Sequence, residues 1–149
     1  MPIDQELRVE LLRRAEQDQR TRHALDRFLA ASPDGRMAGT DPEEGRAIDR
    51  LGEIDAANTG WLRAIVESRG WPTRSLVGED GARAAWLLAQ HADEDPDFQL
   101  RCLELMSCAD PAEVDAVNLA YLTDRVQLAL GQEQTFGTQM EWRRREVAA

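Results

Sequence analysis

Residues 41–72 read DPEEGRAIDRLGEIDAANTGWLRAIVESRGWP, and this segment contains the start, the body and the end of one α-helix. Asp41 can accept hydrogen bonds from the free N–H groups of a first turn, and the proline after it fits the first helical position. Glu44 stands where a capping box places its acid. Gly70, followed by Trp-Pro, is a stop signal. The segment therefore predicts a helix over 42–69.

The same signals recur along the chain. Two further Asp-Pro pairs, at Asp95 and Asp110, mark helix starts, and Gly131 marks a stop. Together they predict additional helices near 4–30, 79–92, 96–107 and 111–131, with a weaker one at 139–147. Loops are expected at about 31–41, 70–78 and 132–138. No segment alternates with period two for long enough to indicate a strand.

These elements predict an all-α protein, a single-domain bundle of five to six helices with short loops. A length of 149 residues suits one domain. We expect residues 1–149 to form it, with a core over about 4–140 and a polar tail at 141–149.

Composition limits the function. The 18 cationic residues are all Arg, against 28 Asp and Glu, for a net charge of -10. The lack of Lys excludes a Schiff-base lysine and a Walker-type phosphate loop. The net acidity argues against nucleic acid and anionic membranes as partners. We therefore expect neither nucleic acid nor membrane binding.

The two cysteines and the N-terminus predict the compartment. Cys102 and Cys108 lie six residues apart on one predicted helix, a poor spacing for a disulfide, so both are interpreted as reduced packing residues. The N-terminus has no basic and apolar segments of a signal peptide, and no apolar run approaches the ~20 residues of a membrane span. We expect a cytoplasmic protein.

Polar side chains interrupt the apolar stripes of four predicted helices. Burying an isolated charge is costly, so such groups must be paired, hydrogen-bonded or directed toward a wet cavity. Because several helices share this feature, we expect the groups to converge inside the bundle. They are Asp18 and Arg22 in the first helix, Asp55 and Asn58 in the second, His91 at the end of the third, and Asp124 with Arg125 in the fifth on a stripe of Val114, Val117, Tyr121 and Leu128.

Each of these features also has a plain structural interpretation. Asp18 and Arg22 suit a salt bridge at a bundle edge, and the Asp124-Arg125 pair suits an interhelical ion pair. Asp55 with Asn58 suits a contact to a neighbouring helix, and a histidine at a helix C-terminus is favoured by the dipole. The segment 132–139, rich in amides and hydroxyls, could close over a ligand or be an ordinary polar loop.

The sequence also resembles a bacterial family, the domain of unknown function 6624. The resemblance spans about residues 7–140. It implies a helical domain with polar motif residues and no known reaction. One departure is Phe136, where a Tyr is expected. The matching residues are Asp18-Gln19 with Arg22, Asp55 with Asn58, Gly70-Trp71-Pro72 with Val77-Gly78, Gln90-His91-Ala92-Asp93 with Gln99, Asp124-Arg125-Val126, and the run from Gln134 to Gln139.

His91 is the natural candidate for a general acid–base, because imidazole titrates near neutral pH. Asp124 or Asp55 could orient its ring, and Arg22 or Arg125 could hold a carboxylate or phosphate. No nucleophile is evident. His91 and nearby Asp residues could ligate a metal, but no spacing supports this, and we expect neither metal nor cofactor. Further substrate contacts are expected from Asp18, Asn58, Trp71, Gln90, Gln134, Thr138 and Gln139.

Two functions remain open from the sequence. The first is a small-molecule site inside the bundle for an anionic or polar ligand, either a binding site alone or a catalytic site for proton transfer, elimination or hydrolysis around His91. The second is a non-enzymatic interaction module, an adaptor or immunity-like protein, in which the buried polar groups specify helix register. The sequence predicts no oligomeric state.

Overall fold

The computed structural model describes residues 2–31 and 42–139. The predicted helix at 139–147, the polar tail at 141–149 and nearly all of the loop at 31–41 lie outside these residues. No helix within the described ranges is long and apolar enough to cross a membrane.

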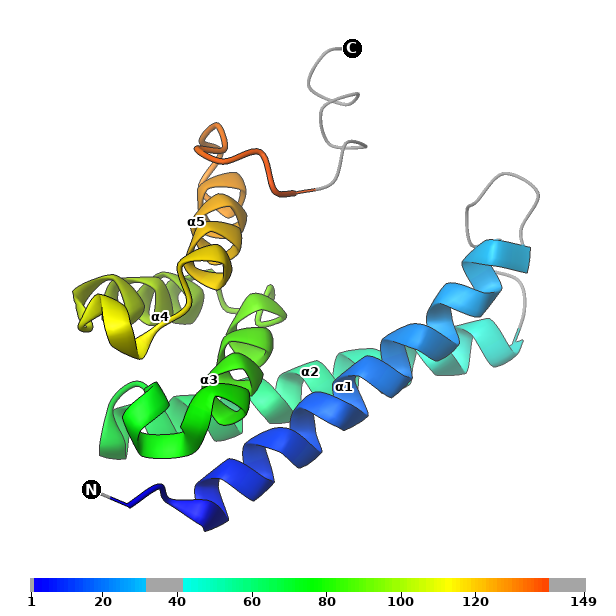
Figure 1. The fold of residues 1–149 in the computed structure, drawn as a ribbon. Helices are drawn as coiled ribbons and strands as arrows, with labels where there is room; N and C mark the ends of the chain where they lie inside the picture. The colour runs from blue at the N-terminus through cyan, green and yellow to red at the C-terminus, as the bar shows by residue number, and fades with distance from the viewer. Residues whose placement is uncertain (1, 32–41, 140–149) are drawn as a thin grey trace.

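The prediction of an all-α fold is confirmed. Helices α1 and α2 form a long hairpin, α3 packs against its lower half, and α4 and α5 lie on the other side of α3 (Figure 1). The described elements are α1 (Gln5–Ala31), α2 (Pro42–Arg69), α3 (Arg74–Gln90), α4 (Pro96–Cys108), a 3-10 turn η1 (Pro111–Glu113) and α5 (Ala116–Ala129).

The capping signals in the sequence set most of the boundaries. The Asp95 side chain accepts a hydrogen bond from the Phe98 N–H at 3.1 Å and begins α4. Gly70 has φ of +79°, a left-handed conformation that ends α2 after Arg69. Gly78 has the same φ and separates a first turn of α3 from its regular part, which explains why the sequence predicts a start at 79.

The predicted helix at 111–131 is divided in two. Asp110 caps only the 3-10 turn η1, because Val114 then adopts an extended conformation. Asp115 caps α5 through the N–H groups of Val117 and Asn118. Glu113, at the end of η1, accepts hydrogen bonds from the Ser75 N–H and hydroxyl and ties η1 to α3.

The break also rotates the face that α5 buries. Val117 is 63% exposed and Tyr121 is 39% exposed, so the predicted apolar stripe is wrong at these two positions. Leu122 and Val126 are buried instead. The stripe was extrapolated through the extended residue at 114, where the helical period does not apply.

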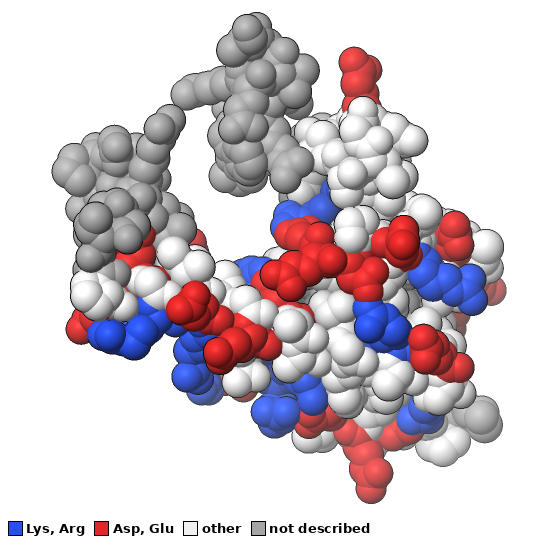
Figure 2. Space-filling view, turned by 180° about the vertical axis from the view of Figure 1, so that it is seen from behind, with Lys and Arg blue, Asp and Glu red and all other residues white. Residues whose placement is uncertain are grey.

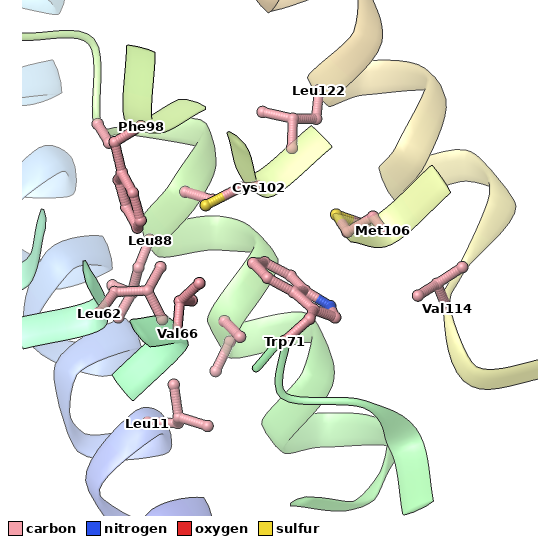
Figure 3. Close-up of a cluster of buried hydrophobic side chains, with 14 of the residues drawn as sticks. Leu11, Leu62, Val66, Trp71, Leu88, Phe98, Cys102, Met106, Val114 and Leu122 are labelled. Atoms are coloured by element: carbon pink, nitrogen blue, oxygen red, sulfur yellow. The ribbon is translucent and has the colours of Figure 1, made fainter. Parts of the chain in front are cut away.

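One core joins all five helices. Leu11 from α1, Leu62 from α2, Leu88 from α3, Cys102 from α4 and Leu122 from α5 are almost fully buried within it (Figure 3).

Only one of the two cysteines belongs to this core. Both are free, and Cys102 is buried, but Cys108 is exposed at the end of α4. The interpretation of Cys108 as a packing residue is therefore wrong, because α4 ends there and its last turn extends past the core. Burial raises the pKa of the Cys102 thiol to about 12, which suits an inert packing residue.

Gly81 allows α3 to approach its own first turn closely. A Cβ at this position would lie 2.8 Å from Cβ of Val77, a contact that forces a backbone shift. Gly81→Ala is therefore expected to lower the free energy of unfolding by about 1–3 kcal/mol. Gly52→Ala is the matched control, since a Cβ there meets nothing within 4 Å, and it should stabilise α2 by about 0.5–1 kcal/mol. Urea denaturation of both variants measures the difference, and equal effects would contradict this account.

Candidate functional site

Asp18 and His91 form a contact between α1 and the end of α3. Asp18 is fully buried, and its Oδ1 lies 2.9 Å from Nδ1 of His91. His91 immediately follows the last helical residue of α3, and its N–H still bonds to the Leu87 carbonyl at 3.1 Å. His91 is therefore held both by its backbone N–H and by Nδ1 of its ring.

Arg22 links this contact to α2. Its Nη1 donates to Oδ1 of Asp18 at 2.7 Å, and its two terminal nitrogens donate to the carboxylate of Asp55 at 3.0 and 2.9 Å. Gln19 donates to the other Asp18 oxygen at 2.9 Å. We call Asp18, Arg22, Asp55 and His91 the interhelical cluster, since its members come from three helices or their ends.

The electrostatics of the cluster favour an ionised Asp18. Burial disfavours the charged carboxylate, but the His91 hydrogen bond and the charges of His91 and Arg22 outweigh it and lower the pKa of Asp18 below 3.8. An ionised carboxylate only accepts hydrogen bonds, so Nδ1 of the ring must be the donor. Nε2 of His91 is then the nitrogen that this contact leaves available.

His91 borders two hollows. The larger has a volume of about 810 Å³ and lies between the upper part of the hairpin and the end of α3, with Leu25, Leu51 and Leu87 in its wall. We call it the outer groove. The smaller has a volume of about 220 Å³ and is lined mainly by α2 and by the segment between α3 and α4. We call it the acidic cavity, because Asp55, Glu94 and Asp95 line it.

A second cluster ties α3, α4 and α5 together. Arg125 donates from Nε to Asp93 Oδ1 at 2.9 Å and from Nη2 to the other oxygen, and it also reaches Gln139 at 3.2 Å. Gln99 donates to Asp93 at 3.1 Å and to the last carbonyl groups of α3. The Ala89 carbonyl also accepts from the Ala92 N–H at 3.1 Å, so Gln99 adds a side-chain cap to the end of α3.

Asp124 orders the segment after α5. It is fully buried and accepts hydrogen bonds from the Phe136 N–H at 2.8 Å, the Thr138 N–H at 2.8 Å and the Thr138 hydroxyl at 2.6 Å. Burial opposes ionisation of this carboxyl, but these donors lower its pKa overall. Gln134 accepts from the Gln139 N–H at 2.8 Å and closes the loop. The Phe136 side chain is exposed, so the Asp124 contact uses only its backbone.

The structure thus divides the predicted site residues. Asp18, Arg22, Asp55 and His91 lie together, and Asp18 is the carboxylate that contacts the ring. The sequence predicts that all these residues converge on one site, but a second group lies apart from His91 and holds the segment after α5 in place. That group consists of Asp124, Arg125, Gln134, Thr138 and Gln139.

Three predicted residues lie outside both clusters. Asn58 accepts from Arg14 at 3.0 Å, and its buried Nδ2 has no partner among the described residues. Trp71 is buried and lines a small hollow of about 50 Å³ with Trp86. Gln90 is buried beside His91 in the chain, and its Oε1 has no hydrogen-bond partner within residues 2–31 and 42–139.

Sequence reasoning missed Arg63 and Glu94 at the acidic cavity, and it assigned Asp95 only as a helix cap. Arg63 forms an ion pair with Asp95, so this carboxylate serves two contacts. Proximity to His91 was the available signal for Glu94, which is three residues away. No group of three or more His, Cys, Asp or Glu residues within 2–31 and 42–139 is arranged to hold a metal ion.

Comparison with known proteins gives a family. No curated protein and no solved structure matches the chain. The model of a family of unknown function, DUF6624, matches residues 5–144. The match includes both clusters and all five helices, so the chain belongs to the DUF6624 family.

Proposed function

We propose that the protein binds a small polar molecule beside His91 and performs acid–base chemistry on it. The observation that carries this proposal is the 2.9 Å contact between buried Asp18 and Nδ1 of a histidine that borders two hollows. A carboxylate on one ring nitrogen fixes the tautomer and leaves the other nitrogen to exchange a proton with a ligand.

The roles follow from the contacts. Asp18 orients the ring and stabilises the imidazolium that forms when Nε2 accepts a proton. Arg22 and Gln19 hold Asp18 in place, and Asp55 anchors Arg22 to α2. Positioned proton transfer of this kind contributes ~10²–10⁴-fold to a rate. Proton transfer, elimination and hydrolysis by an activated water are the reaction types that this arrangement suits.

The arginines are not used as anion clamps in this proposal. Arg22 is shared between Asp18 and Asp55, and Arg125 is bidentate on Asp93. Each guanidinium would have to abandon a carboxylate to hold an anionic ligand. On the face in Figure 2, acidic side chains gather across the centre, with arginine side chains beside and below them.

A panel of small metabolites, screened by thermal unfolding, tests this function. A ligand at about 100 times its Kd should stabilise the wild type by about 2.7 kcal/mol, seen as a rise in Tm. His91→Gln should lose this rise. Glu133→Gln removes one negative charge from an exposed side chain and should keep the rise in Tm. A ligand that stabilises wild type and His91→Gln equally contradicts the proposed site.

Nitrogen NMR provides a second readout that needs no ligand. The neutral ring of His91 should carry its proton on Nδ1, and Asp18→Asn should remove this preference. His23 is exposed and is the other histidine of the chain, so it serves as the internal reference. A neutral His91 with its proton on Nε2 would contradict the assigned role of Asp18.

The second candidate function, an interaction module, also has a specific observation in its favour. Four of the large apolar side chains that are exposed belong to α5 or the segment after it: Val117, Tyr121, Leu130 and Phe136. Co-purification from the native source, comparing Phe136→Asp with His91→Gln, separates the two functions. A stoichiometric partner that Phe136→Asp loses and His91→Gln retains favours the module.

A further inference from the structure

We infer that the ligand is an elongated organic cation, with its charged group in the acidic cavity and an apolar part in the outer groove. This inference rests on the proposed function and names the ligand class for the same site. The observation behind it is that His91 lines two hollows whose walls have different chemistry.

The acidic cavity has an excess of negative charge. Three carboxylates line it, from Asp55, Glu94 and Asp95, against the single guanidinium of Arg63. Arg63 is already paired with Asp95, and Asp55 with Arg22. Counting Arg22 as well still leaves one negative charge in excess.

Glu94 supplies that excess. It makes no hydrogen bond or ion pair within the part of the chain that the structure describes. Glu94 is exposed where it lines this hollow, so its carboxylate is accessible to a cation, and solvent screens part of the attraction. An anion placed there would instead face three like charges.

The size of the acidic cavity limits what enters it. Its volume of about 220 Å³ is below the ~300–1,000 Å³ that is typical for whole ligands, so it suits a single small group such as an ammonium or guanidinium. Its α2 wall carries the small residues Ala56 and Gly60. A Cβ added at Gly60 would meet nothing within 4 Å, which shows that this wall is open.

The outer groove suits the rest of the ligand. It is several times larger. Leu25 from α1, Leu51 from α2 and Leu87 from α3 supply its apolar surface, and the rest of its lining is polar: Gln19, Arg20, Arg22, His23, Asp26 and His91. His91 lines both hollows, so a ligand that occupies both would lie beside its ring. The bond nearest Nε2 would therefore lie between the apolar part and the cationic group.

Calorimetry with three simple probes tests the inference. The probes are hexylamine, ethylamine and hexanoate, at pH 7.5 and one ionic strength. Hexylamine should bind best, because burying its additional methylene groups is favourable, and ethylamine should bind at least about tenfold more weakly. Hexanoate, which has the same length and the opposite charge, should give no binding.

Two variants separate the two halves of the ligand. Glu94→Gln should weaken hexylamine binding about threefold, the size expected for one exposed charge pair, and Glu133→Gln, also exposed, should leave it unchanged. Leu51→Ala should weaken hexylamine and leave ethylamine unchanged. Leu87→Ala repeats this test on α3, and circular dichroism verifies that each variant is folded.

The outcomes distinguish this inference from the proposed function. If hexanoate binds and shifts the His91 ring signals while hexylamine does neither, the ligand is not a cation, but the site at His91 stands. Binding of hexylamine that leaves the His91 signals unchanged, or that Glu94→Gln does not weaken, would also overturn the inference. If no probe and no metabolite perturbs His91, both the inference and the proposed function fail.

Discussion

Asp18→Ala is expected to lower the free energy of unfolding by about 3–5 kcal/mol, the range for removing one partner of a buried ion pair. Asp18 is fully buried and accepts hydrogen bonds from Arg22, Gln19 and His91. Its removal leaves Gln19 and Nδ1 of His91 without this acceptor and leaves Arg22 with Asp55 alone, at the junction of three helices. Urea denaturation with a linear extrapolation measures the loss.

Asp80→Ala is the matched control for this variant. Asp80 also pairs with a guanidinium through both oxygens, at 2.8 and 2.6 Å to Arg8, but its side chain is 49% exposed. An exposed pair contributes about 0–1 kcal/mol. If Asp18→Ala costs no more than Asp80→Ala, then the interhelical cluster does not stabilise the bundle.

The contribution of Asp18 to stability should also depend on pH. The pKa of Asp18 is lower in the folded protein than its ordinary value of 3.8, so its ionisation stabilises the fold above that pH. The contribution is lost as the pH falls through the lowered pKa. The difference in stability between wild type and Asp18→Asn should therefore be full at neutral pH and shrink below about pH 4.

Asp124→Ala should release the segment after α5 and lower the free energy of unfolding by about 3 kcal/mol. Three donors from Phe136 and Thr138 converge on this buried carboxylate, and a hydrogen bond to a charged group contributes ~1.5–3 kcal/mol. Amide hydrogen exchange should show the loss directly, because the N–H groups at 136 and 138 would exchange much faster.

A conservative comparison tests whether Asp124 acts through these bonds. Thr135→Ala removes only an exposed hydroxyl that contacts Gln127, so it should leave the exchange at 136 and 138 nearly unchanged. Exchange at these two amides that stays slow in Asp124→Ala would show that other contacts order the segment. His91 should keep its Nδ1 proton in this variant, since Asp124 does not touch the ring.

Local chemistry made most of the fold predictable. The Asp caps and the left-handed glycines act within one turn of their own position, so Asp95 and Gly70 could be read from the sequence alone. The start of α5 could not be read in this way. Asp110 and Asp115 are both good caps five residues apart, and the contact of Glu113 with Ser75 on α3 is a tertiary interaction.

The site was predictable only as a set of residues. The helical period showed that Asp18, His91 and Asp124 fall on buried faces, and two of them are fully buried. Which carboxylate meets the ring depends on how α1, α3 and α5 cross, and periodicity carries no information about crossing. The ring therefore pairs with Asp18 on α1, while Asp124 turns toward its own C-terminal neighbours.

The unequal surroundings of the two cysteines have a practical consequence. Cys108 is exposed at the end of α4, whereas Cys102 is enclosed and its thiol does not ionise at neutral pH. A maleimide dye would thus attach at a single point without any mutation. Fluorescence from that point would report rotational freedom and complex formation for the unmodified sequence.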